Sequence, residues 1–149
     1  MSTVAEYAAH VERLARELGV TVDDGYAGGR GGVAQFKRAT VRIRPVKSAV
    51  TYAMALHELG HFGVGSISRK VGRLSEEGAA WRWAMSHALE WTDAMDAKMR
   101  KSITSYFRGY DRKYFRGQNI RWPEGDDPVW LLTDYQPRME RDEFKPVVA

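Results

Sequence analysis

Two histidines and a glutamate within one short segment are the residues of this chain best suited to chemistry. The segment His57-Glu58-Leu59-Gly60-His61 has the HExxH pattern, which is typical of the metal-binding helix of zinc metallopeptidases. Residues four positions apart share one face of a helix, so His57 and His61 can bind the same ion, and Glu58 can reach a water molecule at that ion. The pattern predicts a metal site beside a carboxylate base.

A third protein ligand is expected, because catalytic zinc usually has three protein ligands and one open position. A histidine six residues after His61 is absent, since that position is Ile67, and the chain has no cysteine. The third ligand is therefore expected to be a carboxylate. Glu76 and Glu77 follow His61 by 15 and 16 residues, a distance that lets a second helix return across the first, and either could bind. Alternatively, both carboxylates only stabilise the positive end of a helix.

The residues before this motif predict one helix and a small sheet. Thr3 and Gly19 are suited to the start and the end of a first helix, and apolar and polar residues alternate before Pro45 as in a half-buried strand. The predicted elements are a helix over 3–18, a strand over 39–44 and a partner strand over 20–22 or 33–36. The glycine-rich stretch 25–32 lacks the Gly-Lys-Ser/Thr ending of a phosphate-binding loop and is expected to be an ordinary loop.

The motif and the residues after it predict further helices. Ser48 is expected to cap the HExxH helix, which ends at the glycines at 63 and 65, and Ser75 to cap a helix from Glu76 to about residue 107, with or without a break. Apolar residues at helical spacing are expected to face the core: Ala84, Ala88, Met95, Met99 and Ile103. Beyond Gly117, tryptophans and leucines among prolines predict an extended tail on the domain.

Composition and charge limit the class of protein. The 149 residues, 44% hydrophobic and 28% charged, suit one globular domain, and the helices and strands predicted above make its fold class α+β. The chain has neither an apolar run long enough for a membrane span nor an N-terminal signal peptide, so we expect a soluble, cytoplasmic protein without a membrane partner. Lys/Arg exceed Asp/Glu by one in residues 1–97 and by seven in 98–121, whereas residues 122–149 have net charge −4.

The basic segment 98–121 contains Tyr-Phe-Arg-Gly twice, at 106–109 and 114–117. Cations interleaved with aromatic rings are typical of proteins that bind single-stranded nucleic acid. A solvated helix face, neutralised by the acidic tail, explains the same charges, and we favour that interpretation.

A second motif gives the chain a family resemblance. Residues Glu77-Gly78-Ala79-Ala80-Trp81-Arg82-Trp83-Ala84 match the Glu-x-x-Ala-x-x-aromatic-Ala pattern that follows HExxH in the ImmA/IrrE family of small zincin-like metallopeptidases of phages and mobile elements. The resemblance covers residues 4 to 90. In place of the Leu-Leu-Met-Pro-like stretch that often follows in that family, this chain has residues 86–91, and no helix-turn-helix accompanies the domain.

The resemblance implies a minimal zincin-like fold: an N-terminal helix, a small sheet, the HExxH helix and a ligand-bearing helix. It implies that His57, His61 and Glu77, rather than Glu76, hold zinc, and that Glu58 activates water to cleave a protein or peptide substrate of narrow specificity. Residues 1–97 would form the metallopeptidase domain, 98–121 a helical extension of it and 122–149 an acidic tail.

Three points stay open at this stage. The domain could instead be a metal-containing binding module without proteolysis, although a binding module has no need for Glu58. Nucleic-acid binding through 98–121 is a third, less favoured possibility. The donor that would stabilise the oxyanion in peptide hydrolysis is unassigned, and the chemically eligible residues are Tyr52, His87, Tyr106, Tyr110 and Tyr114.

Overall fold

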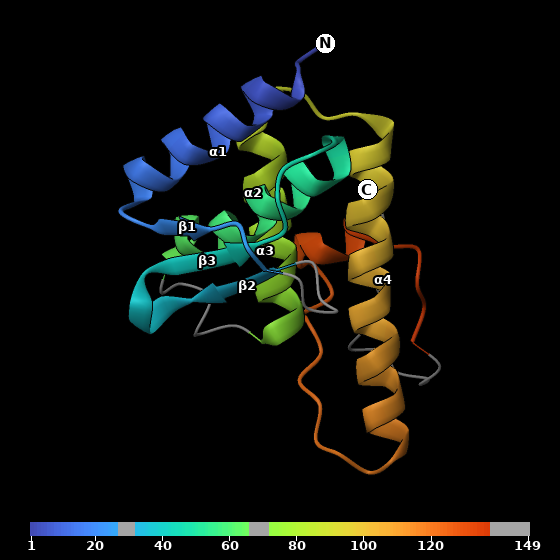
Figure 1. Cartoon of the computed structure of the whole chain (residues 1–149). Coiled ribbons are helices and arrows are strands. Elements are labelled where there is room, and N and C mark those ends of the chain that lie inside the picture. Colours follow the sequence, from blue (N-terminus) through green and yellow to red (C-terminus); the bar gives the residue numbers. More distant parts are fainter. Residues whose placement is uncertain (27–31, 66–71, 138–149) are drawn as a thin grey trace.

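The computed structural model describes residues 1–26, 32–65 and 72–137. Over these residues the fold is α+β, as predicted, with four α-helices and a three-stranded mixed sheet (Figure 1). The elements are α1 (Val4–Leu18), β1 (Thr21–Asp23), β2 (Gly32–Gln35), η1 (Phe36–Arg38), β3 (Thr40–Ile43), α2 (Ala49–Gly63), α3 (Arg73–His87), α4 (Asp93–Phe115) and η3 (Pro128–Leu132).

The N-terminal helix and the sheet form as the sequence indicates. The Thr3 side chain accepts a hydrogen bond from the backbone N–H of Glu6, and Gly19 ends α1 in the left-handed conformation with φ of 70°. Both predicted partner strands are present, because β3 pairs with β1 in parallel and with β2 in antiparallel fashion. Val41 and Ile43 of β3 point into the core, and β2 lies at an edge of the sheet.

Helix α2 lies at the centre of the molecule, with the sheet on one side and α4 on the other (Figure 1). Ser48 and Thr51 form a capping box at its start, so the predicted cap is confirmed. Helix α3 packs closely along α2, because Gly60 has no side chain: a Cβ atom at Gly60 would collide with the backbone carbonyl oxygen of Ala80. This contact brings the HExxH segment within reach of α3.

The predicted start of the next helix is wrong. Helix α3 begins at Arg73 with Gly72 as its N-cap, so Ser75 is a buried residue inside the helix and not a cap. Leu74 and Ser75 are buried in the added first turn, so core packing favours a helix that begins three residues earlier. Tertiary packing overrides the local capping signal at Ser75.

The long helix predicted to end near residue 107 is two helices, α3 and α4, and α4 continues to Phe115. Between them the backbone N–H of Leu89 donates to the Tyr52 hydroxyl at 3.0 Å, and Glu90 accepts from the Tyr7 hydroxyl at 2.7 Å. These bonds to α2 and α1 keep residues 88–92 out of a helical conformation. Thr92 then caps α4. The sequence allowed a break but could not place it.

Helix α4 buries the predicted apolar row and receives the segment that follows it. Met95, Met99 and Ile103 are buried, as expected, and the next residue of the row, Phe107, lies with its ring centroid 4.9 Å from that of Trp130. An entirely extended tail is wrong, because residues 128–132 form a 3-10 helix that packs on α3 and α4. Residues 27–31 of the predicted loop and 138–149 of the acidic tail lie outside the described residues.

Helix α4 is the longest described helix, with 23 residues, and it is rich in charged side chains. In the three described stretches of the chain, no helix combines the length and the apolar character that crossing a membrane requires.

The contact between α2 and α3 can be tested with two glycines that both lie in helices. We expect Gly60→Ala to lower the free energy of unfolding by about 1–3 kcal/mol, because the added methyl group must push α3 away. Gly109→Ala in α4 is the matched control: the nearest atom to its Cβ is 3.8 Å away, so it should raise stability by up to about 1 kcal/mol. Urea unfolding of the metal-free proteins measures both, and equal stabilities would contradict the close contact.

Candidate metal centre

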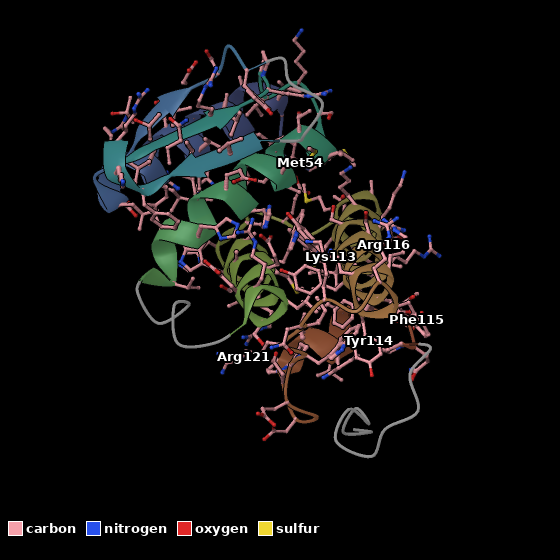
Figure 2. The ribbon with its side chains drawn as sticks, turned by 90° about the horizontal axis from the view of Figure 1, so that it is seen from below. Met54, Lys113, Tyr114, Phe115, Arg116 and Arg121 are labelled. Carbon is pink, nitrogen blue, oxygen red and sulfur yellow. The ribbon has the colours of Figure 1, made fainter. Side chains whose placement is uncertain are left out.

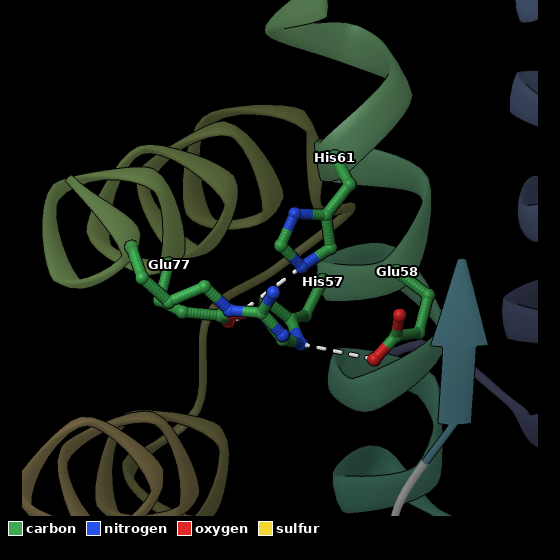
Figure 3. A network of polar contacts seen from close by, with 5 residues as sticks. His57, Glu58, His61 and Glu77 are labelled. Carbon is green, nitrogen blue, oxygen red and sulfur yellow. Dashed lines mark hydrogen bonds and ion pairs between the residues drawn. The ribbon is translucent and has the colours of Figure 1, made fainter. Parts of the chain in front are cut away.

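Three side chains from α2 and α3 converge on one point (Figure 3). Glu77 Oε2 lies 2.8 Å from His57 Nε2 and 3.5 Å from His61 Nε2, and one ligand atom of each residue lies within 4.8 Å of the others. The three side chains are only 9%, 10% and 3% exposed. Two imidazole nitrogens and one carboxylate oxygen are a common donor set for metal ions, so this buried group could hold a metal.

The charges in the cluster favour a cation. Burial lowers the pKa of His57, but its hydrogen bonds with Glu58 and Glu77 outweigh burial and raise this pKa to about 9. Burial raises the pKa of Glu77, but hydrogen bonds with His57 and His61 outweigh it and hold this pKa well below its usual range. Without a metal the cluster therefore keeps a proton at neutral pH, and a metal ion would take the place of that positive charge.

Glu58 lies on the other side of His57. Its Oε1 atom is 3.4 Å from His57 Nδ1, and Figure 3 shows its carboxylate directed toward His57, with Glu77 on the far side of that imidazole. Gly32 of β2 passes close by, since a Cβ atom there would lie 2.9 Å from Glu58 Cγ. Glu58 thus stands beside the three-residue cluster without being part of it, which is the position expected of a base.

Two residues that orient the cluster were not predicted from the sequence. The Trp81 ring stacks on His57 with centroids 4.3 Å apart and planes 8° apart, and Arg73 Nε lies 3.7 Å from Glu77 Oε1. Both are four residues from Glu77 on α3, so they share its face of the helix. The four-residue spacing from Glu77 is the sequence feature that could have identified both residues. Their contacts restrict the rotation of the His57 imidazole and of the Glu77 carboxylate.

The cluster opens into a cleft of about 880 Å³ between β2, α2, α3 and α4. His57, Glu58, His61 and Glu77 all line it. Glu76, the alternative third ligand, also lines the cleft but is not part of the cluster. The structure therefore brings together the ligand set that the second motif selects.

Of the five eligible oxyanion donors, Tyr106 and Tyr110 of α4 line the cleft. The other three point elsewhere: Tyr52 is buried with its hydroxyl 2.6 Å from His10 Nδ1, His87 stacks on Trp83, and Tyr114 is exposed outside the cleft lining. Burial and the charge of Glu77 raise the pKa of Tyr106 to about 12. Its hydroxyl is therefore protonated at neutral pH and can donate a hydrogen bond.

Comparison of the chain with protein-family models, with curated proteins and with solved structures found no match. The resemblance to the ImmA/IrrE family stays a prediction that depends on residues 57–61 and 77–84.

The identity of the third ligand can be tested with two adjacent glutamates. We expect the protein to bind about one zinc per chain, and Glu77→Gln to weaken zinc binding by more than the 10- to 100-fold that loss of an outer hydrogen bond typically costs. Glu76→Gln removes the same charge one residue away and should bind zinc as the wild type does. Isothermal titration with zinc measures both. The opposite order of the two variants would move the third ligand to Glu76, and undiminished binding by His57→Ala would exclude the site.

Proposed function

We propose that this protein is a zinc-dependent endopeptidase. The observation that carries the proposal is the buried cluster of His57, His61 and Glu77, which opens into a cleft with Glu58 beside it. Two histidines and one glutamate are a ligand set of catalytic zinc sites, in which a fourth position stays open for water or substrate. An ion at the floor of an open cleft is accessible to a polymer substrate, whereas a purely structural zinc is usually enclosed by four protein ligands.

The edge strand supports a polypeptide as the substrate. Gly32, Val33 and Ala34 of β2 line the cleft, and β2 pairs with β3 along its other edge. Backbone groups at a strand edge can hydrogen-bond to a polypeptide, and such bonds do not depend on its side chains. A peptide bound there would run past Glu58, because Gly32 lies against Glu58.

The roles of the side chains follow from their positions. A zinc ion bound by the cluster would polarise the scissile carbonyl group and acidify a water molecule. Glu58 would take the proton that this water loses as its oxygen bonds to the carbonyl carbon, and would pass the proton to the nitrogen as the C–N bond breaks. Trp81 and Arg73 would hold His57 and Glu77 in place.

Tyr106 is the proposed donor to the oxyanion. It belongs to the α4 wall of the cleft, which His57, Glu58, His61 and Glu77 line from the other side. A hydroxyl that stays protonated can stabilise the negative charge that develops on the carbonyl oxygen.

The two other functions suggested by the sequence have less support. A metal-containing binding module would not require Glu58 at the wall of the cleft. A nucleic-acid surface over 98–121 would need exposed rings, yet Phe107 is buried in the core and Tyr106 lies in the cleft. The exposed rings of Tyr114 and Phe115 lie together at the end of α4, away from α2 (Figure 2), so they do not continue a row of exposed rings along the helix.

Replacement of Glu58, the proposed base, tests the proposed peptidase activity. We expect Glu58→Gln to keep the fold and the bound zinc but to slow peptide cleavage by at least about 10²- to 10⁴-fold, because the amide cannot take a proton. Digestion of a proteome-derived peptide library, followed by mass spectrometry, provides the substrates. Cleavage at the wild-type rate by the Gln variant would contradict the mechanism. If the zinc-loaded wild type cleaves nothing, the binding module becomes the better proposal.

Replacement of the proposed oxyanion donor tests the opposite wall of the cleft. We expect Tyr106→Phe to lower kcat by about 10²- to 10³-fold with little change in KM or zinc content, because the lost hydrogen bond forms with the transition state. Tyr114→Phe, on the same helix but outside the cleft lining, is the control and should keep full activity. A Tyr106→Phe enzyme as active as this control would exclude the role.

A further inference from the structure

One face of α4 forms the wall of the cleft opposite the metal cluster. The residues of this face recur at three- and four-residue intervals, as expected for a single helical stripe. They comprise two lysines at one end, a lysine at the other end and small or aromatic residues between them: Lys98, Lys101, Ser102, Ser105, Tyr106, Gly109, Tyr110 and Lys113. The wall is therefore basic at both ends and uncharged in the middle.

The lysines at the first end are available to a ligand. Lys98 is half-buried and Lys101 is exposed, and within the described ranges neither has a carboxylate at ion-pair distance. The nearby acid Asp96 pairs with Arg100 at 2.8 Å instead. Among the residues that the structure describes, no carboxylate therefore neutralises these two ammonium groups of the cleft lining.

Lys113 has a similar position at the second end. It is exposed, and its Nζ atom lies 4.9 Å from the centre of the Tyr110 ring. Figure 2 shows Lys113 on the side of α4 that faces α2 and α3, while Phe115 and Arg116 lie on the far side. The contact with Tyr110 holds the cation toward the cleft without neutralising it.

The sequence spacing along α4 gives the distance of the lysines from the middle of the cleft wall, which faces the metal cluster. Tyr106, which lines the cleft together with the cluster residues, follows Lys98 by eight residues and precedes Lys113 by seven. At about 1.5 Å per helical residue, each end of the row lies about 10–12 Å from the middle. An extended peptide spans this distance in about three residues.

We propose that the cleft selects peptides with acidic side chains about three residues before and three residues after the cleaved bond. Lys98 and Lys101 bind one carboxylate and Lys113 binds the other, while the backbone between them follows the α4 wall, passes the cluster and crosses the edge of β2. This inference specifies the substrate class of the proposed peptidase and depends on that function.

A nucleic acid fits the same wall less well. Its phosphates repeat along the whole strand, but the α4 wall has no cation between Lys101 and Lys113. The other side of the cleft carries the carboxylates of Glu58, Glu76 and Glu77 together with Arg73, which is paired with Glu77, so the two remaining carboxylates repel a continuous polyanion. Two separated carboxylates on an otherwise neutral peptide match this pattern of charge.

A binding measurement tests the charge selection separately from catalysis. The zinc-loaded Glu58→Gln protein is titrated into two fluorescein-labelled peptides of equal length with a central Ala-Leu bond. One peptide carries Glu three residues before and three residues after this bond, and the other carries Gln at both positions. An oligothymidylate of similar length is the third probe. We expect the Glu peptide to bind about five- to tenfold more tightly than the Gln peptide at low salt, and this difference to shrink as salt rises.

Charge-matched variants identify the source of the difference. In the same background, Lys98→Gln/Lys101→Gln/Lys113→Gln should remove the preference for the Glu peptide. The control Arg16→Gln/Lys47→Gln/Arg112→Gln removes three exposed charges outside the cleft lining and should keep it. Equal binding of the two peptides, loss of the preference in the control, or tighter binding of the oligothymidylate would overturn the proposal.

Cleavage of the peptide library by the zinc-loaded wild type separates the two hypotheses. Cleaved bonds flanked by acidic residues support both. Cleavage without any enrichment of acidic residues overturns the charge selection and leaves the peptidase intact. Absence of cleavage, together with a preference for the Glu peptide that the cleft lysines provide, overturns the peptidase and retains an acidic-peptide site.

Discussion

The candidate site depends on how closely α2 and α3 approach each other. At Gly60 the absence of a side chain lets the backbone of Ala80 lie against α2, and at Gly63 the Trp83 indole occupies the space that a Cβ atom would fill. These contacts lie between the HExxH segment and the second motif, so both motifs describe one interface. Larger residues at these glycines would separate the helices and move Glu77 away from His57.

The polar cluster at this interface must offset the cost of its burial. A carboxylate with 3% of its side chain exposed is stable only with a partner that supplies positive charge or hydrogen bonds. The two histidines and Arg73 supply these partners, and the flat face of Trp81 excludes water from one side of His57. Such a cluster prefers a cation at its centre, and this preference links the packing of two helices to the chemistry we propose.

Local signals predicted most of the fold and most of the site. The caps at Thr3 and Ser48 and the alternation in β3 depend on neighbouring residues, so they can be recognised in the sequence. The pair His57 and His61 is fixed by helical spacing alone. These features required no knowledge of tertiary structure.

The features that were missed depend on contacts between distant segments. The break before α4 depends on hydrogen bonds from residues 89 and 90 to Tyr52 and Tyr7, across 37 and 83 positions of sequence. Among the five eligible donors to the oxyanion, Tyr52 and His87 are occupied by contacts with His10 and Trp83, and the three tyrosines of α4 differ in whether their side of the helix faces the cleft. The role of Trp81 was missed for a different reason, because an aromatic residue in a helix usually indicates core packing. Its contact with His57 forms only when α3 packs on α2.

The basic segment shows how helical geometry assigns two roles to one stretch of sequence. In α4, Met95, Met99, Ile103 and Phe107 form one face, which is buried in the core, and the cleft lysines lie on another. The charge of residues 98–121 therefore does not act as a single surface. Part of it, as in Arg100, pairs with acids on its own helix, and part faces the cleft across from the carboxylates of the candidate site. The apolar row fixes the rotation of α4 about its axis, and this rotation turns the lysines toward the cleft, so core packing determines the electrostatics of the site.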